Sequence, residues 1–119
     1  MNYPYRPSRE SIVAHVRAVL DDTDVRVTRA IVLGSVARDE HDAMSDTDML
    51  VVSPDFEGAP GARRGRPYRD RWECERFGSV DFVEYTPAEY DEYRRREDGF
   101  IAVAEREGTP VVSIATEPN

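Results

Sequence analysis

The apolar residues of the chain occur in short blocks separated by polar turns, a pattern typical of alternating helices and strands. Residues 1–7 contain two prolines and are expected to form a flexible arm. Ser8 can cap a first helix. The buried face of that helix is predicted from apolar residues at helical spacing: Ile12, Val13, Val16, Val19 and Leu20.

Three later blocks predict strands, because they are rich in β-branched residues and end in turn residues. They cover residues 30–33, 47–53 and 79–85. A short helix is expected over residues 36–40. Residues 54–67, rich in Gly, Pro and Arg, are expected to form a loop.

The remaining segments add helices and one further strand. Pro67 can begin a helix that continues to about residue 76, and Thr86, Pro87 and Glu89 form a capping sequence for the next. Another helix is predicted over 100–106, and an edge strand over 110–114. The order α-β-α-β-α-β-α-α-β predicts one small α/β domain spanning residues 1–119, and ligands of such domains bind at the ends of strands.

Composition limits the classes of protein that fit. The longest uncharged apolar run, residues 49–52, is far shorter than the roughly 20 residues that cross a bilayer. No signal-peptide pattern is present, so we expect a cytoplasmic protein without membrane contact. The single cysteine, Cys74, excludes an internal disulfide and a zinc site built from several cysteines.

The charge of the chain is unusual. The 16 basic residues are all arginine, and against 24 acidic residues they leave a formal net charge of −8. An acidic surface without lysine fits a halophilic host, whereas a GC-rich genome would also replace lysine by arginine. The negative field argues against direct nucleic-acid binding, which needs a basic face. A polyanionic ligand would need a local positive charge to offset this field, such as a bound metal ion.

Three features carry candidate chemistry. Gly34 and Ser35 end a strand and begin a helix, which suits an anion but is also a common turn. Asp46 and Asp48 lie on one face of a strand, about 6.5 Å apart, and repel each other unless a cation lies between them. Their alternative is a solvated strand edge or a cap. Asp81 interrupts an apolar strand, so it either faces solvent or joins a charge-neutralising site.

These carboxylates predict a metal site if the second and third strands are neighbours. Asp81 could then lie beside Asp46 and Asp48, and three such ligands suit Mg²⁺. Two ions about 3.5–4 Å apart would favour in-line attack on a nucleotide phosphorus.

The motif Gly34-Ser35, ten residues, Asp46-x-Asp48 and an apolar strand resembles the DNA polymerase β nucleotidyltransferase superfamily. The most similar type is the minimal nucleotidyltransferase, which is about this long. The match covers residues 30 to about 85 by motif and the rest by length and element order. The resemblance implies a palm fold, with a small mixed sheet flanked by helices.

The resemblance also implies roles for individual residues. Gly34 and Ser35 would hold the β- and γ-phosphates of ATP, and Arg38 would offer a cation to the triphosphate. Asp46 and Asp48 would bind both Mg²⁺ ions. Asp81 would complete one metal site and help to deprotonate a hydroxyl acceptor. Asp39 is a departure, since many relatives have Gly there.

Relatives of this type are often paired with a HEPN-domain ribonuclease toxin, which they neutralise as antitoxins, in some pairs by transferring AMP to a tyrosine. The resemblance thus implies a HEPN partner that supplies the acceptor, and a complex with it. An interface could include Tyr85, Tyr90, Tyr93 and Phe100, although aromatic residues at this spacing are more often core. Two alternatives stay open: a non-catalytic antitoxin that acts by binding, and an adenylyltransferase of small molecules.

For several other residues a structural role is the simpler interpretation. His15 and His41 are expected at the surface, and Trp72 is expected to anchor a helix against the sheet. The arginine-rich cluster could steer ATP or an acidic partner, but a solvated loop is the simpler interpretation; it comprises Arg63, Arg64, Arg66, Arg69 and Arg71.

Overall fold

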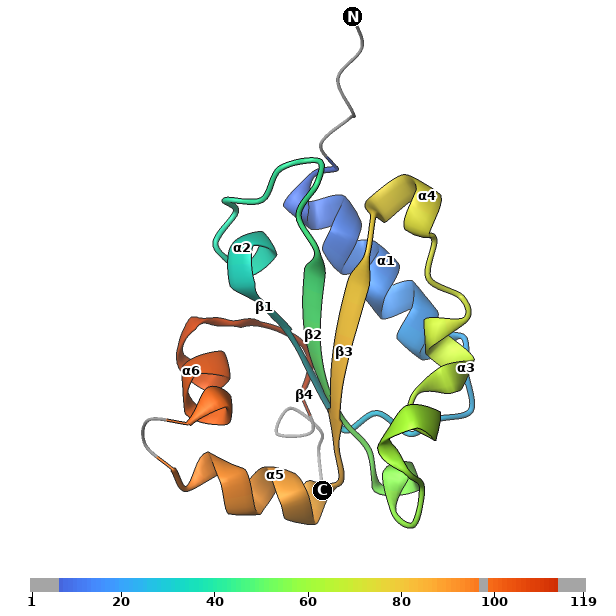
Figure 1. Cartoon of the computed structure of the whole chain (residues 1–119), viewed down its shortest axis with the longest axis vertical. Coiled ribbons are helices and arrows are strands. Elements are labelled where there is room, and N and C mark those ends of the chain that lie inside the picture. The colour runs from blue at the N-terminus through green and yellow to red at the C-terminus, as the bar shows by residue number, and fades with distance from the viewer. Residues whose placement is uncertain (1–6, 97–98, 114–119) are drawn as a thin grey trace, which may run out of the picture.

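A computed structural model of the chain describes residues 7–96 and 99–113 (Figure 1). Its strands are β1 (Arg29–Leu33), β2 (Thr47–Val52), β3 (Val80–Tyr85) and β4 (Thr109–Ser113). Its α-helices are α1 (Arg9–Asp21), α2 (Gly34–Ala37), α3 (Arg66–Arg69), α4 (Cys74–Phe77), α5 (Pro87–Arg94) and α6 (Phe100–Glu107). Two single 3-10 turns, η1 (Pro54–Phe56) and η2 (Gly61–Arg63), lie between β2 and α3.

The four strands form one mixed sheet in the order β3-β2-β1-β4. Strand β1 runs antiparallel to both of its neighbours, β2 and β4, whereas β2 and β3 run parallel. The second and third strands are therefore neighbours, which was the condition for bringing the three aspartates together. The small mixed sheet flanked by helices confirms the predicted fold class.

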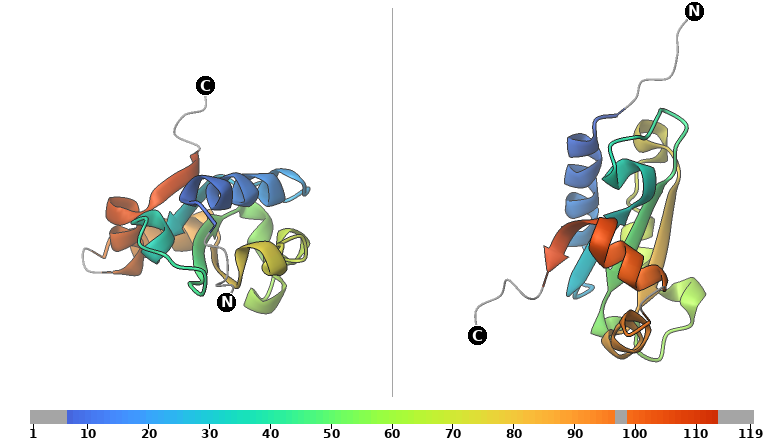
Figure 2. Two further views of the ribbon diagram at one scale, coloured as in Figure 1. Left: turned by 90° about the horizontal axis from the view of Figure 1, so that it is seen from above. Right: turned by 90° about the vertical axis from the view of Figure 1, so that its left-hand side faces the viewer.

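Helices cover both faces of the sheet (Figures 1 and 2). Side chains of β1 and β2 alternate between two hydrophobic clusters, so the two central strands are buried on both sides. One cluster joins Val32 and Met49 to α1, α3 and α4. The other joins Ile31 and Leu50 to α5 and α6. Helix α6 also contacts β1 directly, which places it over the end of the central strand.

The helix boundaries follow local capping chemistry. The side chain of Ser8 accepts a hydrogen bond from the backbone N–H of Ser11, as expected for the cap of α1. At α5, Thr86 and Glu89 form a reciprocal capping box, with Pro87 in the first turn. Both predicted helix starts are confirmed.

The helix predicted over residues 67–76 is wrong, because the segment divides into α3 and α4 with a turn between them. In that turn the backbone N–H of Glu73 donates to Nε2 of His15. Trp72 is buried, and its indole N–H donates to the carbonyl of Gly78 at 2.8 Å. Tertiary partners thus replace the hydrogen bonds of a continuous helix. Trp72 does anchor this segment to the core.

Two other boundaries differ from expectation. The helix predicted over 36–40 begins at Gly34 and ends at Ala37, because Asp39 adopts a left-handed conformation (φ 56°) that a helix cannot continue through. Of the predicted arm, residues 1–6 lie outside the described residues, whereas Pro7 is buried and accepts a hydrogen bond from His41. Within the described residues no helix has the length and apolar character needed to cross a membrane.

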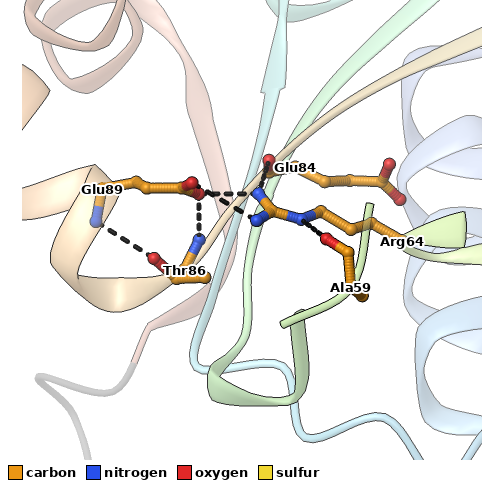
Figure 3. Close-up of polar contacts among 5 residues, drawn as sticks. All are labelled: Ala59, Arg64, Glu84, Thr86 and Glu89. Carbon is orange, nitrogen blue, oxygen red and sulfur yellow. Dashed lines mark hydrogen bonds and ion pairs between the residues drawn. The ribbon is translucent and has the colours of Figure 1, made fainter. Parts of the chain in front are cut away.

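Polar contacts attach the arginine-rich segment to β3 and α5 (Figure 3). Arg64 donates to the carbonyls of Ala59 and Glu84, each at 3.1 Å, and to the carboxylate of Glu89. Glu84 in turn accepts from Arg69 and from the hydroxyl of Tyr68. The carbonyl of Glu84 lies on an outer strand of the sheet, so Arg64 supplies a donor that no neighbouring strand provides.

Candidate active site

The pairing of the strands brings the predicted site residues to one edge of the sheet. Leu33, at the end of β1, pairs with Asp48 near the start of β2, and Asp48 pairs with Asp81 near the start of β3. Because β1 is antiparallel to the other two strands, its end and their starts lie side by side. Gly34 follows Leu33 directly and therefore lies at the same edge.

A pocket of about 400 Å³ opens at this edge. Four of the predicted site residues line it: Gly34, Arg38, Asp48 and Asp81. The opposite wall comes mainly from α6 and consists of Phe100, Val103, Ala104, Glu107 and Gly108. A wider hollow of about 540 Å³, near residues 21–25, contains none of the predicted site residues.

Gly34 is required by its backbone and by its surroundings. Its φ of +66° lies in the left-handed region that favours glycine. A Cβ atom at this position would lie 2.9 Å from Oδ2 of Asp48. The missing side chain therefore lets the turn after β1 approach the carboxylate of β2 closely. Ser35, the next residue of α2, is half-buried and is not among the residues that line the pocket.

The three aspartates differ in exposure. Asp48 is half-buried, whereas Asp81 is exposed, as is Asp46, which precedes β2. Burial raises the pKa of Asp48 above its ordinary value, and the negative charges of Asp81 and Asp46 raise it further. Asp46 and Asp81 are thus close enough to oppose the ionisation of Asp48, and a cation beside Asp48 would favour its charged form.

The donor chemistry of the aspartates fits Mg²⁺, which prefers carboxylate oxygens. Their arrangement is more open than a closed metal site. In the part of the chain that the structure describes, no three His, Cys, Asp or Glu side chains are grouped tightly enough to hold a metal ion. Asp48 and Asp81 line the pocket, whereas Asp46 does not line it and acts on Asp48 through its charge.

Arg38 brings a positive charge to the pocket from the turn after α2. Its side chain is half exposed and its Nε donates to the carboxylate of Glu40 at 2.7 Å. The backbone of this turn is held by bonds from the N–H of Arg38 to the carbonyl of Gly34 and from Glu40 to Ser35. The guanidinium therefore stands at the pocket beside the turn predicted to bind phosphate.

The wall formed by α6 was not predicted as part of the site. The spacing of Phe100, Val103 and Ala104 predicts a helix face, but nothing in the spacing says which part of the sheet that face covers. The residue that could have indicated this packing is Gly108. A Cβ there would overlap Ile31 and lie 3.0 Å from the carbonyl of Val32, so this glycine lets the end of α6 lie directly on β1.

Comparisons with known proteins agree with this geometry. A family model described as a nucleotidyltransferase domain matches residues 14–117. A crystal structure from Sulfolobus solfataricus, named provisionally as a nucleotidyltransferase, has a TM-score of 0.51 and 21% sequence identity. The match covers 77% of this chain and 84% of that one, and it shows a shared fold. No curated protein matches the chain. The family match spans most of the chain, and we conclude that this protein belongs to the nucleotidyltransferase-domain family.

Proposed function

We propose that the protein transfers a nucleoside monophosphate, AMP from ATP, to a hydroxyl acceptor in a reaction that depends on Mg²⁺. The observation that carries the proposal is the shared pocket. It brings a glycine turn, a guanidinium and two carboxylates together, with the charge of a third carboxylate acting on Asp48. A triphosphate needs the first two groups, and a bound cation needs the carboxylates.

Each residue has a role in this proposal. Gly34 and Ser35 present backbone N–H groups to the β- and γ-phosphates, and Arg38 neutralises part of their charge. Asp46, Asp48 and Asp81 would hold Mg²⁺, which stabilises the charge that develops on the phosphates. The acceptor oxygen attacks the α-phosphorus, the bond to the β-phosphate breaks, and pyrophosphate leaves. Asp81, an exposed carboxylate that lines the pocket, accepts the hydroxyl proton.

The acceptor belongs to another molecule in this proposal. No Ser, Thr or Tyr is among the described residues that line the pocket. In this proposal the hydroxyl enters the pocket from outside. We propose a tyrosine of a HEPN-domain toxin as that acceptor, with the protein acting as its antitoxin in a complex. The support for this partner is the resemblance to minimal nucleotidyltransferases.

Calorimetry in high salt tests the nucleotide site. Titration with ATP and Mg²⁺ is expected to show saturable binding that depends on Mg²⁺, and an Asp46→Asn/Asp48→Asn variant is expected to lose it. As a matched control, an Asp21→Asn/Asp24→Asn variant removes the same charge from two exposed residues elsewhere in the chain. It should bind ATP normally. A folded wild-type protein that does not bind ATP would contradict the proposal.

A transfer assay tests the acceptor. Incubation with ATP labelled on the α-phosphate and a HEPN-domain ribonuclease should label a tyrosine of that ribonuclease. The Asp46→Asn/Asp48→Asn variant should transfer no label. If that variant still neutralises the ribonuclease, the antitoxin acts by binding alone, and the catalytic proposal is wrong.

A further inference from the structure

The pocket has two chemically different ends, and α6 connects them. Gly108, directly after the helix, packs on β1 near the Gly34 turn. Phe100, at the start of the helix, also borders a second hollow, together with Tyr85 of β3 and Tyr93 of α5. With a rise of 1.5 Å per residue, the eight-residue helix separates these ends by about 10 Å. The pocket therefore runs from the phosphate-binding turn toward β3.

The end near Phe100 is apolar and accessible. The side chains of Phe100 and Val103 are 49% and 38% exposed, although most large apolar residues in the described part of the chain are buried. Val83 of β3 faces them across the same pocket. Exposed apolar residues that line a concave site beside charged groups are typical of ligand contacts.

We propose that the base of the bound nucleotide rests against Phe100 and Val103, and that the pocket holds the base through its flat faces. This inference rests on the proposed function, because it requires a triphosphate at Gly34 and Arg38. A single nucleotide then fills the pocket, with its phosphates at the β1 end, its α-phosphate at the carboxylates and its base on the apolar wall.

The same wall has a consequence for specificity. The side chains of Phe100, Val103 and Val83 carry no hydrogen-bonding group. Among the described lining residues the one side-chain donor is Arg38, beside the phosphate turn, and Glu107 adds an acceptor at the Gly108 end of α6. A wall of this kind contacts the face that all bases share and does not read their edges. We expect ATP, GTP, CTP and UTP to bind within about tenfold of one another. The choice of ATP would then come from cellular abundance or from the partner.

Calorimetry with the full chain and Mg²⁺ separates base from phosphate binding. The probes are the four nucleoside triphosphates and inorganic tripolyphosphate, which has no base. Phe100→Ala is expected to weaken all four nucleotides by about 5- to 100-fold, the range that one stacked base provides. Tripolyphosphate should bind as it does to the wild type. Phe100→Trp should retain nucleotide binding, and Met44→Ala, at an exposed apolar residue outside the pocket, should change neither.

The possible outcomes distinguish this inference from the function on which it rests. If Phe100→Ala binds nucleotides normally but transfers slowly, the wall belongs to the acceptor and the inference is wrong. A preference of more than 100-fold for one base would also overturn it. Wild-type protein that binds tripolyphosphate as tightly as ATP would refute the base contact and leave the phosphate site standing. Protein that binds neither would overturn both.

Discussion

At the scale of single residues, Asp39 ends α2 through its backbone conformation. Here Asp39 has a φ of 56°, in the left-handed region, which Asp adopts more easily than most residues with a side chain. The position thus selects for backbone conformation, and Asp is a residue that meets the requirement.

Substitutions at Asp39 should follow this conformational rule. Asp39→Gly keeps easy access to positive φ and is expected to lower the free energy of unfolding less than Asp39→Val does. Asp39→Val should lower it by about 1–2 kcal/mol, since β-branched residues strongly disfavour positive φ. Urea denaturation measures both. Glu57→Val, at an exposed residue with φ −61°, is the matched control and should cost little.

The two histidines show where interpretation of isolated residues fails. Both were expected at the surface, and both are buried. His15 stacks on Phe77, with ring centroids 4.5 Å apart, and its Nε2 accepts a hydrogen bond from the backbone of Glu73. The partners of His15 are about 60 residues away in sequence. A local pattern therefore could not identify them.

His15 should make the protein less stable in acid. Burial lowers its pKa below 6.5, with a neighbouring Glu73 opposing and Arg76 adding to the effect. Below about pH 6.5, His15 therefore binds a proton more readily in the unfolded chain than in the folded protein. The free energy of unfolding falls as the pH is lowered through this range. Urea denaturation between pH 7.5 and 5.5 should show a smaller loss for His15→Gln than for wild type. Equal slopes would contradict this assignment.

At the scale of elements, the arginine-rich segment is a structural connection. The simpler interpretation, a solvated loop, is wrong for Arg64 and Arg69, which pair with Glu89 and Glu84. Hydrogen bonds from Arg64 lower the pKa of Glu89, with bonds from Thr86 adding to the effect. The segment thereby joins β3 to α5, and its arginines are less available for steering ligands than their number suggests.

Removing Arg64 should loosen this connection. Its guanidinium is 14% exposed and contacts two carbonyls and one carboxylate. Arg64→Met is expected to lower the free energy of unfolding by about 1–3 kcal/mol, because the edge carbonyl of Glu84 and the carboxylate of Glu89 lose their donor. Thermal denaturation measures the change. Arg63→Met, at the exposed neighbouring arginine, should alter stability by less than about 0.5 kcal/mol.

Strands were easier to predict than the helices between them. The apolar runs of β1 and β2 are dictated by burial on both faces, so the positions of these two strands follow from the sequence alone. The division between α3 and α4 depends on two contacts that the local pattern does not show. The N–H of Glu73 donates to His15 of α1, and the indole of Trp72 donates to the carbonyl of Gly78, just after α4. The site was predictable to the same limited extent. Its charged residues follow a motif with fixed spacing, whereas the apolar residues of its wall depend on how α6 packs.

At the scale of the whole molecule, the aromatic residues fall into two groups. Tyr90 is buried in the cluster under α5 and α6, as the core interpretation expected. Tyr85 and Tyr93 pack edge to face beside it, whereas Phe100 remains exposed. Of the four residues considered for an interface, Phe100 is thus the most accessible, and it borders the pocket.

The net charge of −8 should make stability depend on salt. Repulsion among 24 acidic side chains opposes compaction, and at 1 M salt the Debye length is only about 3 Å. We expect the melting temperature to rise between 0.05 and 1 M NaCl. Sucrose of matched osmolality, which does not screen charge, should reproduce less of the rise. A melting temperature that falls with NaCl would contradict the halophilic interpretation of the composition.

The late position of α6 and β4 in the chain has a consequence for protein synthesis. Gly34, Arg38, Asp48 and Asp81 leave the ribosome well before residues 100–113, which form the apolar wall and the fourth strand. Chains are made from the N-terminus, and early segments can begin to fold first. A nascent chain that stops before Phe100 therefore carries these polar groups of the pocket without the wall on which we place the base. Nucleotide binding should begin only after residues 100–113 have left the ribosome.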